Sequence, residues 1–131
     1  MLTRNTIQKS IIYETVINMH NHPTAEEIYI SINKKYPHIS KGTVYRNLNI
    51  LADNGKIKRI EIPNDSDRYD VRKDIHHHLK CITCNNVYDV EIDQKKDIMM
   101  NITNKNDFQI DSYQIIFTGK CNNCINKIKE D

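Results

Sequence analysis

Two CxxC pairs constrain the fold of this chain more than any other feature of its sequence. Cys81 and Cys84 form the first pair, and Cys121 and Cys124 form the second. All four cysteines lie in the C-terminal part of the chain. Such a set forms either two disulfides or one tetrathiolate metal site. A chain of 131 residues that divides into two small subdomains buries a small apolar core in each, and we therefore expect extra stabilisation.

The expected compartment favours the metal site. Residues 1–6 carry no apolar segment typical of a secretory signal, and no stretch approaches the roughly 20 apolar residues that span a bilayer. We therefore expect a cytoplasmic protein, and in a reducing cytosol paired CxxC motifs are more often metal sites than disulfides. Because Zn(II) prefers four thiolates in a tetrahedron, the sequence predicts structural zinc bound by Cys81, Cys84, Cys121 and Cys124.

Charge is distributed unevenly along the chain. Residues 1–62 hold nine Lys and Arg against five Asp and Glu, a net charge of +4, whereas residues 63–131 hold ten against twelve, a net charge of −2. A basic front part and a mildly acidic rear part are typical of a polyanion-binding module joined to a domain of another kind. Charged residues that are merely solvated on the protein surface would give the same uneven distribution.

Periodicity and capping signals predict three short helices in the front part, over about residues 5–20, 24–36 and 40–54. The first has apolar residues three to four positions apart. Thr24 and Glu27 form a capping box at the start of the second helix. Ser40 can cap the third, and Asn54-Gly55 can end it in a left-handed conformation. Three short helices with tight joints indicate a helix-turn-helix.

A hairpin is predicted directly after the third helix. Residues 57–62 and 69–71 are short apolar segments, and the turn-forming residues 63–67 separate them. A hairpin in this position is the wing of a winged helix. We therefore predict a winged helix-turn-helix domain over residues 1–73.

The rear part has a different periodicity. Its pattern indicates a strand, a helix and a strand, over residues 87–92, 94–104 and 113–118, with Ile98, Met99 and Ile102 inward. We predict a small α/β dimerisation domain over residues 74–131, so that the fold class of the whole chain is α+β. A sheet of this size needs a partner surface, and a homodimer joined by apolar strand faces or edges is expected.

Three consecutive histidines, His76 to His78, precede the first CxxC pair. In an extended segment His76 and His78 share one face, while His77 and Cys81 lie on the other, so a second metal site becomes natural. Solvated surface histidines have the same spacing. Asp70 and Asp89 flank this segment, and His22 lies between the first two helices. Imidazoles and carboxylates suit Fe(II), Mn(II) or Zn(II), although the sequence alone does not bring His22 and Asp70 to one ion.

Five segments of the chain, taken in order, resemble the ferric uptake regulator family. They are HPTAEEIY at residues 22–29, GTVYRNL at 42–48, RYD at 68–70, HHHLKCITC at 76–84 and CNNC at 121–124. The resemblance extends from about Thr3 to Cys124. It implies a dimeric winged-helix repressor that binds operator DNA and is not an enzyme, with structural zinc on the four cysteines. It also implies a regulatory Fe(II) or Mn(II) site made of His22, Asp70, His76, His78 and Asp89.

Asp70 and Asp89 decide which branch of the family the chain resembles. Iron-uptake members typically place glutamate at these two positions, and the peroxide-responsive branch places aspartate. The chain therefore resembles the peroxide-responsive branch. In that branch Fe(II) and hydrogen peroxide oxidise a ligating histidine, which by correspondence is His22 or His76. This chain departs from the family pattern in two ways. We expect it to lack an additional amino-terminal helix that many members have. It also has Tyr113 where iron-uptake members often have a histidine.

The amino end of the third helix is the expected DNA-reading segment, and its candidate contacts are Lys41, Thr43, Tyr45 and Arg46. Arg46 can pair with guanine, Tyr45 can pack on a thymine methyl group, and Lys41 suits the phosphate backbone. Three basic residues of the wing are expected to neutralise phosphates: Lys58, Arg59 and Arg68.

Other functions share some of these features. An iron, manganese or zinc uptake regulator without a peroxide response requires the same ligands. A metallohydrolase could use the histidine and aspartate cluster, but no catalytic acid-base or nucleophile set accompanies it, and the helix-turn-helix would have no role. Both metals could also be purely structural.

Overall fold

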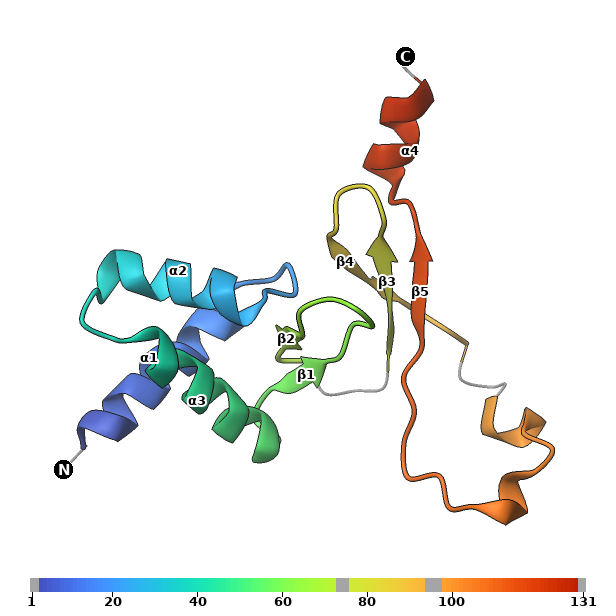
Figure 1. Cartoon of the computed structure of the whole chain (residues 1–131), viewed down its shortest axis with the longest axis horizontal. Coiled ribbons are helices and arrows are strands. Elements are labelled where there is room, and N and C mark those ends of the chain that lie inside the picture. Colours follow the sequence, from blue (N-terminus) through green and yellow to red (C-terminus); the bar gives the residue numbers. More distant parts are fainter. Residues whose placement is uncertain (1–2, 73–75, 94–97, 130–131) are drawn as a thin grey trace. The chain divides into compact units, whose positions relative to one another are not determined.

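A computed structural model describes residues 3–72, 76–93 and 98–129, and divides the chain into two compact units, Met1–Asp74 and Ile75–Asp131. Each unit has its own secondary structure (Figure 1). The predicted boundary between residues 73 and 74 lies outside the described residues. In the described part, no helix has the length and apolar character required to cross a membrane.

The first unit contains the three predicted helices, α1 (Arg4–Asn18), α2 (Ala25–Lys35) and α3 (Lys41–Asp53). Each begins at a hydroxyl cap, because the side chains of Thr3, Thr24 and Ser40 accept hydrogen bonds from amides three residues ahead. In the predicted capping box, the Thr24 hydroxyl also donates to Glu27 Oε1 at 3.3 Å. Gly55, with φ of 74°, supplies the left-handed residue after α3.

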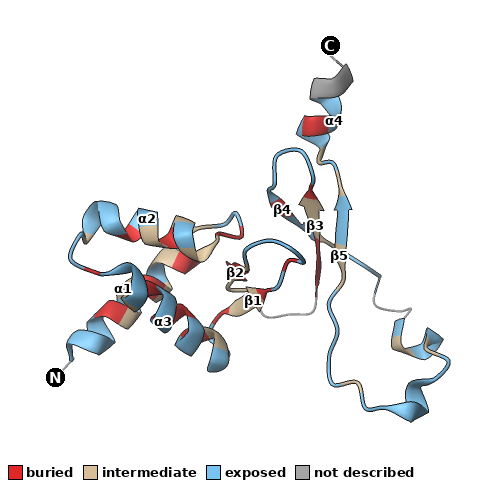
Figure 2. Ribbon diagram, viewed as in Figure 1, coloured by how far each residue is buried: buried red, intermediate tan, exposed pale blue. Residues whose placement is uncertain are grey.

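The core of this unit lies where the three helices meet, and Figure 2 shows their buried residues on the inward sides. Ile12, Ile28, Val44 and Leu48 have 0% exposed surface. Ile57 and Tyr69 extend the same core into the hairpin of β1 (Lys58–Ile60) and β2 (Arg68–Asp70), which are antiparallel as predicted. The fold of this unit is therefore a winged helix.

The second unit is built on a three-stranded sheet in the order β4-β3-β5. Its strands are β3 (His77–Cys81), β4 (Val87–Val90) and β5 (Ile116–Gly119). Strand β3 is antiparallel to β4 and parallel to β5. Leu79 is in register with Tyr88 on one side and with Phe117 on the other, so these three side chains form one apolar row across the sheet.

The helix predicted over residues 94–104 is wrong where it can be compared. Residues 94–97 lie outside the described part, and the following segment forms two short 3₁₀ helices, η1 (Ile98–Asn101) and η2 (Lys105–Asp107). Ile98, expected inward, is 43% exposed. Asn101, Asn104 and Asn106 account for the difference, because asparagine side chains compete for backbone hydrogen bonds and favour turns.

The chain ends in an element that the sequence pattern does not predict. Helix α4 (Asn122–Lys129) begins inside the second CxxC pair. The predicted strand over 113–118 is also shorter and later, since β5 begins at Ile116. The two differences lie at the start of β5 and directly after it, where the chain leaves the sheet.

Candidate metal centres and DNA-reading helix

The four cysteines of the second unit meet at one end of its sheet. Cys81 ends β3, Cys84 lies in the turn after it, Cys121 follows β5 and Cys124 lies in the first turn of α4. Their sulfur atoms all lie within 4.8 Å of one another, and all four residues are thiols. This arrangement supports the tetrathiolate prediction and not the disulfide alternative, because four converging sulfurs are what a tetrahedral ion requires.

Backbone amides prepare this cluster for negative charge. The amides of Cys84 and Cys121 both donate to Cys81 Sγ at 3.5 Å, and these bonds lower the pKa of the Cys81 thiol to about 5. The Tyr88 hydroxyl, 3.9 Å from Cys84 Sγ, lowers the pKa of Cys121 by hydrogen bonding. Burial raises the pKa of Cys124 to about 12. Cys81 is therefore the sulfur best prepared to bind metal as a thiolate.

In the first unit, the side chains of His22 and Asp70 approach to 3.6 Å between Nε2 and Oδ2. The Tyr69 amide donates to the Pro23 carbonyl at 2.9 Å, and Thr24 forms an isolated bridge with Arg68. These bonds attach β2 to the loop before α2, so residues distant in sequence become neighbours. His22 itself has φ of 54°, an uncommon value for a residue other than glycine, and strained backbone of this kind concentrates at functional sites.

In the second unit, His76, His78 and Asp89 lie close together. The Oδ1 atom of Asp89 lies 3.1 Å from His76 Nε2 and 3.4 Å from His78 Nε2. His78 and Asp89 are register partners on β3 and β4, which explains the approach. Both histidines are buried. Two imidazoles and a carboxylate converge here in a geometry that suits a divalent transition metal.

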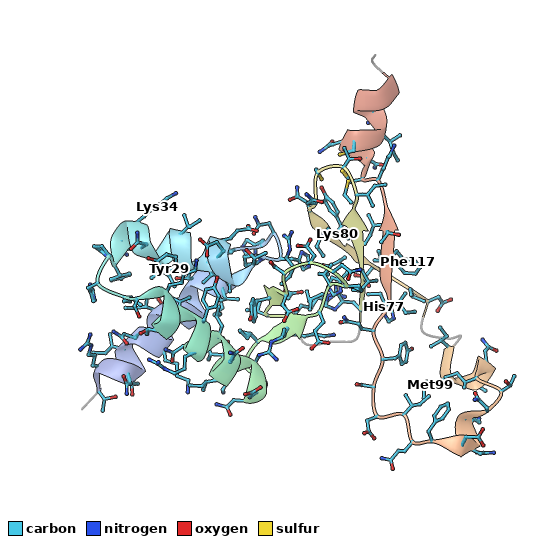
Figure 3. The ribbon with its side chains drawn as sticks, viewed as in Figure 1. Tyr29, Lys34, His77, Lys80, Met99 and Phe117 are labelled. Carbon is cyan, nitrogen blue, oxygen red and sulfur yellow. The ribbon has the colours of Figure 1, made fainter. Side chains whose placement is uncertain are left out.

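His77 lies on the opposite face, as the alternation along a strand predicts. The Ile115 amide donates to His77 Nδ1 at 3.1 Å, and the ring stacks on Tyr113 with centroids 5.7 Å apart. His77 therefore links β3 to the chain before β5. Figure 3 labels His77 and Lys80, which lie on opposite faces of β3.

The predicted DNA-contacting residues lie in the first two turns of α3. Lys41, Tyr45 and Arg46 are exposed, and Thr43 is half-buried. The Thr43 hydroxyl lies 2.9 Å from Ser40 Oγ, so it contributes to the helix cap as well. The amino end of α3 thus presents two cations and one aromatic ring to solvent, as a recognition helix requires.

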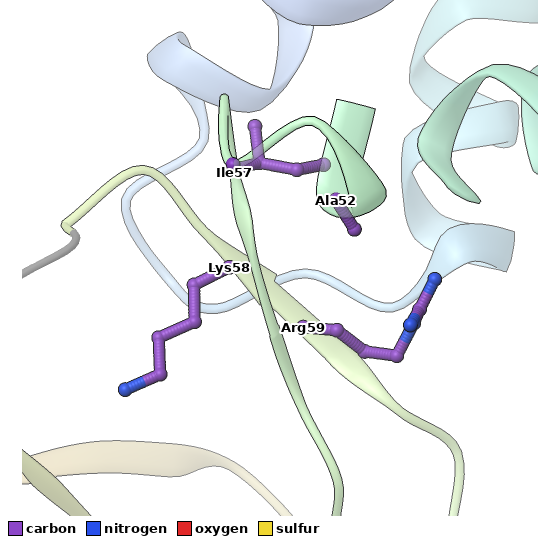
Figure 4. A pocket seen from close by; sticks show the side chains of 5 residues that line it. Ala52, Ile57, Lys58 and Arg59 are labelled. Carbon is purple, nitrogen blue, oxygen red and sulfur yellow. The ribbon is translucent and has the colours of Figure 1, made fainter. Parts of the chain in front are cut away.

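The basic residues of the wing do not behave alike. Lys58 and Arg59 line a shallow hollow between β1 and the end of α3, and their side chains point to different sides of the strand (Figure 4). Arg59 also donates to Asn49 Oδ1 at 2.7 Å. Arg68, expected to contact phosphate, is instead buried, with Nη1 donating to the His22 carbonyl at 3.2 Å and lying 3.7 Å from Glu27 Oε1. The expectation for Arg68 is therefore wrong.

Sequence reasoning also missed Tyr88 and Glu26. Tyr88 lies beside the cysteine cluster, and its position opposite Leu79 in the sheet became apparent only from the register. Glu26 contacts two of the predicted DNA-binding residues, Lys41 and Tyr45. No local pattern signals either contact, because each joins residues on different elements.

A winged helix, a four-cysteine cluster and paired histidine-aspartate groups define the class of metal-dependent transcriptional regulators. The chain belongs to the ferric uptake regulator family, whose sequence pattern matches residues 2–118. It is 31% identical over 121 residues to the peroxide-responsive repressor PerR of Staphylococcus epidermidis, covering 92% of this chain and 81% of that protein.

Solved structures agree with this assignment. The Campylobacter jejuni peroxide stress regulator superposes with a TM-score of 0.73 at 28% identity, covering 92% of this chain and 91% of the other. The Helicobacter pylori ferric uptake regulator Fur has a TM-score of 0.78 at 23% identity, with 93% and 82% covered, and supports the fold. The predicted family and fold class are confirmed.

Proposed function

We propose that this protein is a peroxide-responsive repressor that binds operator DNA as a homodimer while its regulatory metal is bound. The observation that carries the proposal is the combination of aspartate, at both Asp70 and Asp89, with histidine ligands in a chain 31% identical to a PerR repressor. A repressor of this kind acts in the cytoplasm, where the chromosome lies. We assign no catalytic role to any of its described residues.

Two metals have different roles in this proposal. Zn(II) binds Cys81, Cys84, Cys121 and Cys124 and closes the second unit. Fe(II) or Mn(II) binds His22 and Asp70 from the first unit together with His76, His78 and Asp89 from the second. What supports this set is that each unit already holds its own ligands close together, at 3.6 Å for His22 and Asp70 and at 3.1 Å for His76 and Asp89. One ion shared by both units favours the arrangement that fits DNA.

Loss of a histidine ligand is the proposed signal. Fe(II) held by these ligands would cleave the O–O bond of hydrogen peroxide, so that one oxygen atom enters an imidazole C–H bond of a ligand and the other leaves as water. His22 and His76 are the expected targets. The oxidised ring binds metal poorly, so the link between the two units is lost and the DNA is released. The protein is consumed by the reaction and does not turn over.

The test measures DNA binding and oxidation in the same samples. Protein loaded with zinc and either Fe(II) or Mn(II) is assayed by gel shift, with and without hydrogen peroxide, and is then digested for mass analysis. We expect peroxide to abolish DNA binding only with Fe(II), with a mass gain of one oxygen at His22 or His76. Metal-dependent binding that peroxide leaves unchanged, with no oxygen added to either histidine, indicates an iron, manganese or zinc sensor with no peroxide response.

Two histidines provide matched controls for this experiment. His20 lies in the same segment as His22 but is exposed, and His77 lies on the other face of β3 from His78. His22→Ala is expected to abolish metal-dependent DNA binding, whereas His20→Ala leaves it intact. Oxidation of His20 or His77 to the same extent as His22 and His76 would contradict the proposal, because it would show unspecific damage.

A further inference from the structure

Glu26, in the first turn of α2, joins two of the DNA-contacting residues of α3. Lys41 Nζ lies 2.5 Å from Glu26 Oε2, and the Tyr45 hydroxyl donates to the same oxygen at 3.1 Å. The Lys41 ammonium also lies 5.9 Å from the ring centroid of Tyr29 and 5.8 Å from that of Tyr45. Tyr29 lies on the same helix as Glu26 (Figure 3). One carboxylate and two aromatic rings therefore lie beside this cation.

Glu26 and Lys41 are an ion pair at neutral pH. Hydrogen bonding to Lys41, and next to Tyr45, lowers the pKa of the Glu26 carboxyl, while the same bond raises the pKa of Lys41. The two side chains are 49% and 52% exposed, so their pairing adds little to the stability of the fold. An interaction that contributes little to folding but engages two recognition residues points to a role in binding.

The space beside this pair is also acidic. A hollow of about 300 Å³ between α2, α3 and the turn of the wing has Glu26, Tyr45 and Asp67 among its lining residues. A phosphate group that approaches Lys41 from this side meets the Glu26 carboxylate, whereas the Asp67 carboxylate lies 3.9 Å from Arg59 Nε and is partly neutralised by it. The opposite end of α3 differs, since Lys58 and Arg59 line the hollow there. The attraction between DNA phosphates and the protein is therefore weakened at the amino end of the recognition helix.

We propose that Glu26 is a specificity-determining residue for DNA, because it neutralises Lys41 against unspecific phosphates and holds Tyr45 in place to contact a base. This inference rests on the proposed DNA-binding function. Unspecific DNA binding arises almost entirely from the neutralisation of phosphates by Lys and Arg. A lysine that is already paired with a carboxylate therefore lowers the affinity for unspecific DNA. Base readout depends on an oriented side chain, and the bond from the Tyr45 hydroxyl to Glu26 supplies that orientation.

The test compares two DNA probes and Glu26→Gln, which removes the charge and keeps the shape. The first probe is a duplex enriched from a random library by Mn(II)-loaded wild-type protein, and the second is its shuffled sequence. Fluorescence anisotropy is measured over a range of salt concentrations. With the shuffled duplex, we expect about five- to tenfold tighter binding and a log-log salt dependence steeper by about 0.9 per protomer. The preference for the enriched duplex falls.

Two further variants make the result specific to Glu26. Asp53→Asn removes an equal charge from the exposed end of α3 and is expected to leave the preference unchanged. Adding Lys41→Ala to Glu26→Gln is expected to remove the gain in unspecific binding, because that gain acts through the released lysine. Equal salt dependence for Glu26→Gln and Asp53→Asn would overturn the inference.

The wild-type measurements separate this inference from the proposed function. If the wild-type protein shows no metal-dependent preference for any duplex, the proposed function fails, and the inference fails with it. If the wild-type protein discriminates and Glu26→Gln discriminates equally well, only the role of Glu26 is overturned.

Discussion

At the scale of single residues, burial separates side chains that look alike in the sequence. Arg46 and Arg68 are both basic residues of the winged helix, and both were candidates for DNA contact. Arg46 is exposed on α3, whereas Arg68 is only 7% exposed and donates to the His22 carbonyl. A buried guanidinium persists only where hydrogen bonds and opposite charges satisfy it, and Glu27 supplies such a charge. We propose that the first arginine contacts DNA, whereas the second holds the loop that contains His22.

Arg46→Ala tests the first of these roles. We expect operator binding to weaken by roughly 1–3 kcal/mol, because one guanidinium contact to a base edge is lost, while dimerisation is unaffected. Anisotropy with the enriched duplex measures the effect, and Lys34→Ala on α2 is a control that removes an equal charge. Unchanged affinity would remove Arg46 from the DNA contacts.

Arg68→Met tests the second role. The substitution keeps apolar bulk but leaves the His22 carbonyl without its guanidinium donor, and we expect a loss of about 1–3 kcal/mol in the free energy of unfolding. Urea denaturation followed by circular dichroism measures it. A denaturation midpoint equal to that of the wild-type protein would show that the bond to His22 contributes nothing.

At the scale of elements, caps and strand alternation account for most of what forms. Hydroxyl caps begin α1, α2 and α3, and alternation along β3 separates His77 from His78. The cysteine cluster stabilises a unit with little apolar core, since neither η1 nor β5 has a buried residue. The second unit therefore depends on its proposed zinc more than the first unit depends on any metal.

Cys81→Ser tests that dependence. Because structural zinc supplies on the order of 10 kcal/mol of folding free energy, we expect the second unit to unfold and the helices of the first to remain. Elemental analysis should show zinc near zero, and limited proteolysis should leave a fragment containing α1 to α3. The control Thr83→Ser, inside the same CxxC pair, is expected to retain both zinc and protease resistance. A folded, zinc-free Cys81→Ser protein would contradict the prediction.

At the scale of the whole molecule, the second unit exposes an apolar face that suits the proposed homodimer. Tyr88, Leu79 and Phe117 form a row across β4, β3 and β5, and Tyr88 and Phe117 remain 36% and 40% exposed. Strand β5 is also an edge of the sheet. Exposed apolar rows on an open sheet are typical of protein interfaces.

Phe117→Arg is expected to convert the dimer to a monomer, because a charge would be buried against the partner's apolar face. Size-exclusion chromatography with light scattering measures the mass. The control is Thr118→Arg, which places the same charge on the opposite face of β5 and should remain dimeric. A Phe117→Arg protein with the wild-type mass would place the interface elsewhere.

Local patterns in the amino-acid sequence are enough to predict the three helices and the hairpin of the winged helix, the alternation of the histidines and the grouping of the four cysteines. These features depend on caps, turns and periodicity, which act between residues close along the chain. The structure also shows that residues 98–107 do not form one helix. Packing accounts for the burial of Arg68, the approach of Asp89 to His76 and His78, and the contact of Glu26 with Lys41. The contacts of Asp89 and of Glu26 join segments that are distant along the chain, so they depend on how the chain packs and not on local propensity.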